Sequence, residues 1–205
     1  MPDQLSIGTL IFDGFELLDV FGPLEMFGLL PEQFSISMVA QNKGVVTSAQ
    51  GPQCIATESF SNTCNYNLLM VPGGMGTRTE VNNKLLLQWL VQQSQAADYI
   101  CSVCTGSALL ARAGILDGYR ATSNKGAFDW VASQRDTVHW VAEARWVEDR
   151  NIFTSSGVSA GIDMSLAVIA KILGDKKANE VATWAEYEWH KDSELDPFAK
   201  IRGLV

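Results

Sequence analysis

Histidine is scarce in this sequence, which has only His139 and His190 among its 205 residues. The four cysteines supply a single Cys-x-x-Cys pair, Cys101 and Cys104, so the clustered Cys and His ligands of a zinc site are missing and we expect no metal. Each histidine stands apart from the other, and a lone histidine near aromatic residues usually has a packing or surface role. We therefore assign neither histidine a catalytic role.

Basic residues are also few. The chain has 15 Lys and Arg against 23 Asp and Glu, a formal net charge of -8, and such an acidic surface repels phosphate backbones and anionic lipid headgroups. No apolar run approaches the roughly 20 residues that span a bilayer, and the first residues lack the basic segment and cleavage site of a secretion signal. We expect a cytoplasmic protein with reduced cysteines that binds neither nucleic acid nor membrane.

Apolar residues make up 47% of the chain, enough for a substantial core, and we predict a single domain over residues 1–205. Short β-rich runs predict strands at 5–12, 34–40, 67–71 and 99–103, a hairpin at 45–55 and a ribbon from 138–147 and 151–154. Helical spacing predicts helices at 81–95, 105–113, 158–173 and 176–189, and one within 15–29 that begins near Gly22 because Pro23 suits a helix start. The alternation predicts an α/β fold, a flavodoxin-like three-layer sandwich with a mostly parallel sheet and helices on both faces.

Cys104 stands where the apolar strand 99–103 passes directly into a helix that begins with small residues. This is the layout of a nucleophile elbow, which presents a side chain above the carboxyl end of a sheet. The positive end of the helix dipole favours the thiolate, so we expect a lowered thiol pKa. The alternative is that Cys104 is a small buried core residue, the usual environment of a free cysteine.

A second strand, 67–71, ends at Pro72-Gly73-Gly74. Attack by a cysteine needs preorganised donors for the oxyanion, and the N–H groups of Thr105 and Gly74 are our candidates, since glycine allows a close backbone approach. An ordinary strand-to-loop turn is the alternative. The loop is not a phosphate-binding loop, because it lacks the Gly-Lys-Ser/Thr ending.

Taken together, three motifs resemble the ThiJ/PfpI superfamily, which has a class I glutamine amidotransferase-like fold. They are an early acidic residue, a glycine loop and a cysteine elbow, here Leu18-Asp19, Val71-Pro72-Gly73-Gly74 and Val103-Cys104-Thr105-Gly106. The resemblance continues through residues 113–122 and 154–163. Thr105 after the cysteine is similar to the isonitrile (isocyanide) hydratase branch, whereas the protease-like and glyoxalase-like branches typically have histidine there.

The resemblance implies a cofactor-independent lyase that hydrates an isocyanide to an N-substituted formamide. Cys104 would be the nucleophile, Asp19 the acid and base beside it, and Thr105 and Gly74 the donors to developing charge; a homodimer is also implied. Asp19 by itself is equally compatible with a carboxylate stabilised at a helix N-terminus. Relatives commonly have His-Trp where this chain has Asn124-Lys125, a change that makes a pocket there more polar and leaves the substrate open to an unrelated electrophile, including one with an anionic group.

The sequence is also compatible with other functions. A non-catalytic redox or metabolite sensor would also use a reactive Cys104, and glyoxalase- or amidase-like activity is a further alternative. A ligand-sensing domain of the kind fused to AraC-type regulators is possible, but the chain shows no helix-turn-helix module. Cys101 lies inside the apolar strand, which argues against a dithiol redox site. The stripe of Trp184, Tyr187 and Glu188 is predicted to face the core of the last helix.

Overall fold

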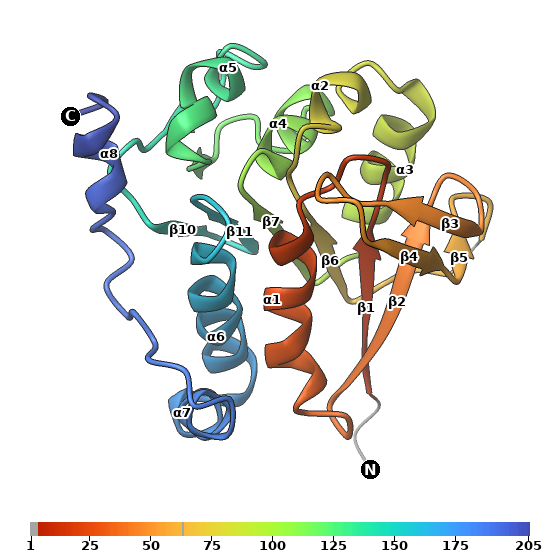
Figure 1. Cartoon of the computed structure of the whole chain (residues 1–205), viewed down its shortest axis with the longest axis horizontal. Helices are drawn as coiled ribbons and strands as arrows, with labels where there is room; N and C mark the ends of the chain where they lie inside the picture. The colour runs from red at the N-terminus through yellow and green to blue at the C-terminus, as the bar shows by residue number, and fades with distance from the viewer. Residues whose placement is uncertain (1–3, 63) are drawn as a thin grey trace.

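A seven-stranded sheet forms the centre of the computed structural model, which describes residues 4–62 and 64–205 (Figure 1). All neighbouring strands run parallel except β10 and β11, which are antiparallel. The mostly parallel sheet predicted from the sequence is therefore confirmed. The strands follow one another across the sheet in the order β10 (Trp146–Asp149), β11 (Ile152–Ser155), β7 (Tyr99–Val103), β6 (Leu68–Val71), β1 (Leu5–Leu10), β2 (Phe34–Ala40) and β5 (Glu58–Ser59).

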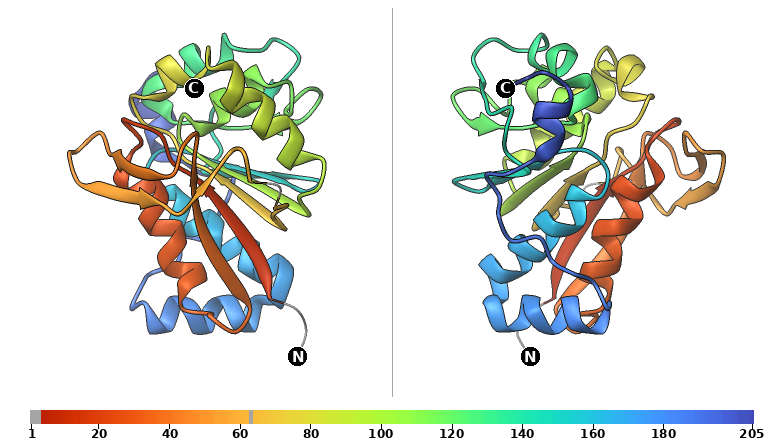
Figure 2. Two further views of the ribbon diagram at one scale, coloured as in Figure 1. Left: turned by 90° about the vertical axis from the view of Figure 1, so that its right-hand side faces the viewer. Right: turned by 60° about the vertical axis from the view of Figure 1, so that its left-hand side comes forward.

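Helices cover both faces of this sheet (Figures 1 and 2). On one face lie α1 (Leu17–Gly28), α6 (Ala160–Leu173) and α7 (Asp175–Trp184), and on the other α3 (Lys84–Ser94) and α4 (Gly106–Arg112) with the short α2 (Thr77–Glu80) and α5 (Phe128–Ala132). Because both faces are covered, β6 and β7 are apolar along most of their length instead of alternating. None of the helices among the described residues has the length and apolar character needed to cross a membrane.

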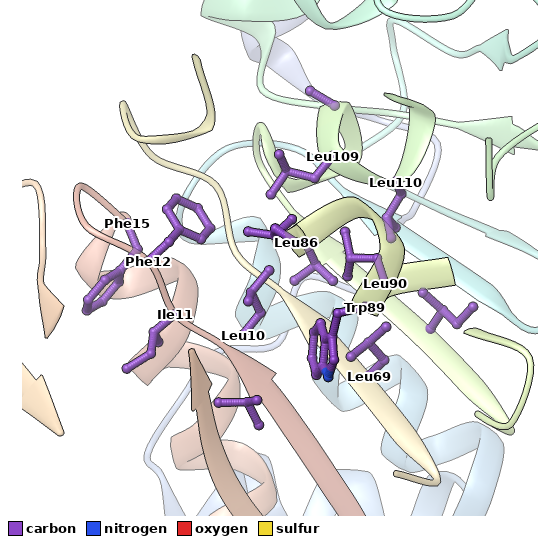
Figure 3. Packing of buried hydrophobic residues seen from close by; sticks show 14 of the residues in the cluster. Leu10, Ile11, Phe12, Phe15, Leu69, Leu86, Trp89, Leu90, Leu109 and Leu110 are labelled. Atoms are coloured by element: carbon purple, nitrogen blue, oxygen red, sulfur yellow. The ribbon is translucent and has the colours of Figure 1, made fainter. Parts of the chain in front are cut away.

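Two buried apolar clusters hold the layers together, one centred under α3 and α4 and the other under α6 and α7, and α1 contributes residues to both. Figure 3 shows the cluster under α3 and α4, where Leu86, Leu90 and Leu109 pack over Leu10 and Leu69 of the sheet. The helix predicted at 81–95 is thus confirmed, with bounds of Lys84–Ser94. Each such buried leucine contributes about 1.5–3 kcal/mol relative to an exposed one, so these contacts fix the helices on the sheet.

Helix α1 begins at Leu17, so the predicted start near Gly22 is wrong and Pro23 lies inside the helix. Proline removes one backbone donor from a helix interior, a cost that tertiary packing offsets here. Gly22 packs so closely on α6 that a Cβ at its position would lie 2.8 Å from Ile162. Leu18 and Phe21 of this helix are exposed, while Leu24 and Phe27 are buried.

The predicted hairpin at 45–55 is β3 (Gly44–Thr47) paired with β4 (Gln53–Ala56), an antiparallel pair outside the main sheet. The predicted ribbon needs correction. Its first half splits in two: β9 (His139–Trp140) pairs with β8 (Arg120–Ala121) outside the main sheet, whereas β10 pairs with β11 and both belong to the main sheet. The turn between β10 and β11 lies at Arg150, as predicted, with a φ of 55°.

The last long helix, α7, ends at Trp184 instead of 189, and Trp184 is 56% exposed. The prediction that Trp184, Tyr187 and Glu188 form one core-facing stripe is therefore wrong. The cause is Asp163, a fully buried carboxylate of α6 that accepts hydrogen bonds from the Tyr187 hydroxyl and the His190 backbone N–H, at 3.1 and 2.9 Å. These bonds stabilise the buried Asp163 carboxylate, and they require residues 187–190 to leave the path that a continued helix would follow.

Three adjacent strands bring loops to the same edge of the sheet. β6 ends before Pro72-Gly73-Gly74, β7 ends before Cys104, and β11 ends before Ser156-Gly157. These strands are neighbours in the order β11-β7-β6 and run parallel, so their carboxyl ends meet. This is the place where ligands gather in open α/β sheets.

Gly106, the first residue of α4, packs directly against the end of β6. A Cβ on Gly106 would lie 2.2 Å from the carbonyl oxygen of Val71, so Gly106→Ala forces the backbone to shift and should lower the free energy of unfolding by about 1–3 kcal/mol. Gly28→Ala is the matched control, because its Cβ would meet nothing closer than 4.0 Å. Urea denaturation of both variants measures the difference; equal stability would show that α4 tolerates displacement.

Candidate active site

Cys104 occupies the sharp turn between β7 and α4, with a left-handed backbone at φ 56°. Such a conformation is uncommon for a residue other than glycine and persists only where surrounding contacts enforce it. The Cys104 N–H donates to the carbonyls of Ser155 and Ser156, at 3.2 and 3.1 Å. The hydroxyls of Ser107 and Ser123 donate to its carbonyl oxygen, at 3.1 and 2.9 Å, so both ends of the residue are held.

The Cys104 side chain is nearly enclosed, with 6% of the residue exposed. Burial raises the pKa of the thiol, the charge of the neighbouring Asp19 carboxylate raises it further, and the N–H groups of Thr105 and Val158 lower it by donating to the sulfur. The sequence predicted a lowered pKa from the helix dipole alone. That expectation did not include the loss of solvation, which disfavours the thiolate here.

Asp19 reaches this cysteine from the first turn of α1, although 85 positions separate the two residues in the sequence. Its carboxyl group is fully buried; Oδ2 accepts a hydrogen bond from the Gly73 N–H at 2.9 Å, and Oδ1 has no partner that meets hydrogen-bond geometry among the described residues. Burial is the main cause that raises its pKa from 3.8 to about 7; Glu16 also raises it, whereas the Gly73 N–H and the Cys104 side chain lower it. Burial thus outweighs any stabilisation of the carboxylate by the helix N-terminus.

The glycine loop after β6 contacts the elbow directly. The Gly74 N–H donates to the Thr105 hydroxyl at 3.0 Å, and the Thr77 hydroxyl donates to the Gly74 carbonyl at 2.7 Å. A Cβ on Gly73 would lie 2.5 Å from the Thr105 nitrogen. The Gly74 amide, a candidate oxyanion donor, is therefore bonded to Thr105, while the amides that face the sulfur are those of Thr105 and Val158.

Val158 is the site residue that the sequence did not reveal. It follows β11 with a φ of 46°, a left-handed conformation that turns its N–H toward Cys104. A β-branched residue rarely adopts this conformation, and the sequence Ser156-Gly157-Val158 does not predict it.

Asn124 and Lys125 lie beside the loop that contains Val158. The Asn124 side chain packs against Gly157, where a Cβ would lie 2.4 Å from Nδ2. Lys125 is buried, and its Nζ donates to the Thr122 hydroxyl at 2.8 Å and the Ala144 carbonyl at 2.5 Å. The two residues that depart from the resembling branch therefore stand next to the site.

The remaining cysteines play no visible part in this arrangement. All four cysteines are free thiols, and Cys101 is buried inside β7, where burial raises its thiol pKa. Among the described residues there is also no group of three His, Cys, Asp or Glu side chains arranged to hold a metal ion.

Comparisons with known proteins agree with this geometry. Residues 6–171 match the DJ-1/PfpI family. The chain is 33% identical over 183 residues to an isonitrile hydratase from Pseudomonas putida, covering 89% of this chain and 78% of that protein. It is 30% identical over 190 residues to the HTH-type transcriptional regulator GbdR of Pseudomonas aeruginosa, of which it spans only 51%.

Solved structures share the fold. A ThiJ/PfpI family protein from Pseudomonas syringae superposes with a TM-score of 0.85 at 31% identity, covering 98% of this chain and 84% of that one. DJ-1beta of Drosophila melanogaster superposes with a TM-score of 0.80 at 19% identity, covering 91% of this chain and 100% of that one. The cysteine elbow, the glycine loop and the match along most of the sequence lead to one conclusion: the chain belongs to the DJ-1/PfpI family, as its motifs predict.

Proposed function

We propose that this protein is a cysteine-dependent hydratase that converts an isocyanide to an N-substituted formamide, with Cys104 as nucleophile and Asp19 as acid and base. The observation that carries the proposal is the pairing of a buried thiol with a buried carboxyl group whose pKa is about 7. The similarity to an isonitrile hydratase over 89% of the chain supports it. A group with a pKa near the working pH is well suited to accept and return a proton.

In the first half of the reaction, the ionised Asp19 accepts the thiol proton as the Cys104 sulfur bonds to the terminal carbon of the isocyanide. Asp19 then delivers that proton to the same carbon, giving a thioimidate. The isocyanide carbon accepts both a nucleophile and a proton, so a thiol and one carboxylate suffice and no cofactor takes part.

In the second half, water adds to the thioimidate carbon and its proton passes through Asp19 to the nitrogen. The tetrahedral intermediate collapses when the carbon–sulfur bond breaks and the hydroxyl proton returns to sulfur. The sum is addition of one water to the isocyanide, with the thiol and the carboxylate restored.

Two backbone donors support the sulfur during these steps. The Thr105 and Val158 N–H groups donate to it in the resting site, and they stabilise the negative charge that develops as the proton leaves. Gly74 acts through Thr105, because its N–H binds the Thr105 hydroxyl. Donors fixed in this way need no reorganisation during the reaction.

The enclosure of Cys104 favours catalysis over peroxide sensing. A redox-sensing cysteine is usually an exposed thiolate of low pKa, whereas this sulfur is buried and its pKa is raised. The glyoxalase- and amidase-like branches typically have a histidine next to the cysteine, and Thr105 in that position argues against these alternatives.

Replacing the nucleophile is the most direct test. Cys104→Ala should abolish conversion of an isocyanide panel to formamides, followed by mass spectrometry, because no thioimidate forms. Cys64→Ala is the matched control, an exposed free cysteine away from the site, and should react as the unaltered protein does. Equal turnover by Cys104→Ala and the control would end the covalent mechanism.

The pH dependence follows from the Asp19 pKa. Because the ionised carboxylate accepts the thiol proton, kcat/KM should rise with pH through about 7 and then level off. Asp19→Asn should lose about 100-fold or more in rate and show no rise in this range. A rate that falls as the pH increases through 7 would contradict the assigned direction of proton transfer.

The raised Asp19 pKa also predicts a stability effect. A carboxyl group with a folded pKa of about 7 and an ordinary value of 3.8 favours the folded state when protonated, so its ionisation costs stability as the pH rises between these values. At 1.36 kcal/mol per unit, the full cost is up to about 4 kcal/mol. Urea unfolding should therefore show Asp19→Asn to be more stable than the unaltered protein at pH 8 but not at pH 4. An equal gain at both pH values would have another cause.

A further inference from the structure

A pocket of about 240 Å³ opens beside the cysteine elbow, and neither the hydration chemistry nor the comparisons assign it a role. One wall is the loop that follows β11, and the opposite wall is the C-terminal segment with α8 (Pro197–Ile201), which lies on the flank of the sheet near α5 (Figure 1). The lining residues that matter for its chemistry are Lys125, Arg145, Val158, Asp196 and Arg202.

This pocket shares its inner wall with the nucleophile. Val158 lines the pocket and also donates its N–H to the Cys104 sulfur. Ser156 lines it as well, and its carbonyl accepts the Cys104 N–H at 3.1 Å. A ligand in the pocket therefore lies against the loop that contacts Cys104, while Cys104 and Asp19 themselves do not line the pocket.

Most of the charge around the pocket is internally neutralised. Arg145 donates through Nε and Nη2 to Asp163, at 2.8 and 2.6 Å. Lys125 Nζ lies 3.8 Å from Asp196 Oδ2, and both side chains are buried. Arg202 differs, because its exposed guanidinium forms neither an ion pair nor a side-chain hydrogen bond with any residue in the described ranges. It leaves one uncompensated positive charge at the pocket of an otherwise acidic protein.

Asp196 holds the start of α8, the helix that precedes Arg202, against the segment that contains Glu143. Its N–H donates to the Glu143 carbonyl at 2.8 Å, and Oδ1 accepts the Phe198 N–H at 3.1 Å at the start of α8. Oδ2 is buried without a hydrogen-bond partner in the described part of the chain.

We propose that the pocket selects isocyanides that carry a carboxylate, with Arg202 as the residue that binds the carboxylate while the isocyanide carbon reaches Cys104. This inference rests on the proposed function. It commits the substrate to a class: a small molecule with an isocyano group at one end and an anionic group at the other. Guanidinium and carboxylate form charge-assisted hydrogen bonds, so the anion contributes binding energy that a neutral ester cannot.

The test compares isocyanoacetate with its methyl ester, which differ in charge at the carboxyl end. The kcat/KM for isocyanoacetate should exceed that for the ester by roughly tenfold. Arg202→Gln should remove that preference through KM while leaving the ester within about twofold, as expected for a group that binds but does not react. Lys200→Gln is the matched control, since Lys200 is an exposed cation on the same helix that does not line the pocket. Equal effects of the two variants, or no preference in the unaltered protein, would overturn the assignment.

A binding measurement separates this assignment from the hydration chemistry. Calorimetry with N-formylglycine, the hydration product, should show binding to Cys104→Ala that weakens roughly tenfold when Arg202→Gln is added. If no isocyanide is hydrated but this weakening occurs, the pocket assignment stands and the proposed reaction fails. If both isocyanides are hydrated equally and Arg202→Gln changes neither binding nor KM, the reaction stands and the pocket assignment fails.

Discussion

The site depends on the contact between Gly73 and the residues on either side of it. Its N–H binds the Asp19 carboxylate, and its Cα leaves no room for a side chain, because a Cβ would lie 2.5 Å from the Thr105 nitrogen and 2.9 Å from Asp19 Oδ2. A side chain here would separate α1 from α4. Gly73 thus joins a carboxyl group from one helix to a cysteine at the start of another, across the carboxyl edge of the sheet.

Close packing of this kind has an electrostatic consequence. Two acidic groups share a buried space with few donors, so burial raises the pKa of each, and ionisation of Asp19 makes loss of the thiol proton harder still. The pair therefore holds one proton over a wide range of pH instead of losing both together. Because burial disfavours the charged carboxylate, the folded state is most stable while Asp19 keeps its proton and loses stability as that proton is released.

The sequence predicts the bounds of those strands and helices that depend on residues close together in the chain. The bounds of β2 and β7 agree with the expected strands, and the cysteine turn was located from an apolar run followed by small residues. The start of α1 does not follow from the sequence. Proline generally destabilises a helix interior, so Pro23 predicts a later start, but its actual cost depends on how α1 packs against α6. The end of α7 was misjudged for a similar reason, since a buried Asp163 far along the chain determines where Tyr187 goes.

The same distinction holds for the site. The motifs predict Cys104, Asp19, Thr105 and Gly74 as site residues, and the structure places the four close together. The motifs predict neither the direction of the thiol pKa shift nor the contact with Val158. Burial depends on every element packed around the sulfur, and a left-handed valine depends on the loop closing against the elbow. Neither the burial of the sulfur nor the backbone conformation of Val158 can be predicted from a short segment of sequence.

The residues around the buried thiol and the pocket wall that carries Arg202 come from different stretches of the chain. Asp19, Cys104 and Val158 all lie within residues 6–171, the part that matches the family, whereas Asp196 and Arg202 lie beyond it. A substitution in the segment after residue 171 can therefore reshape this wall of the pocket without altering Cys104 or Asp19.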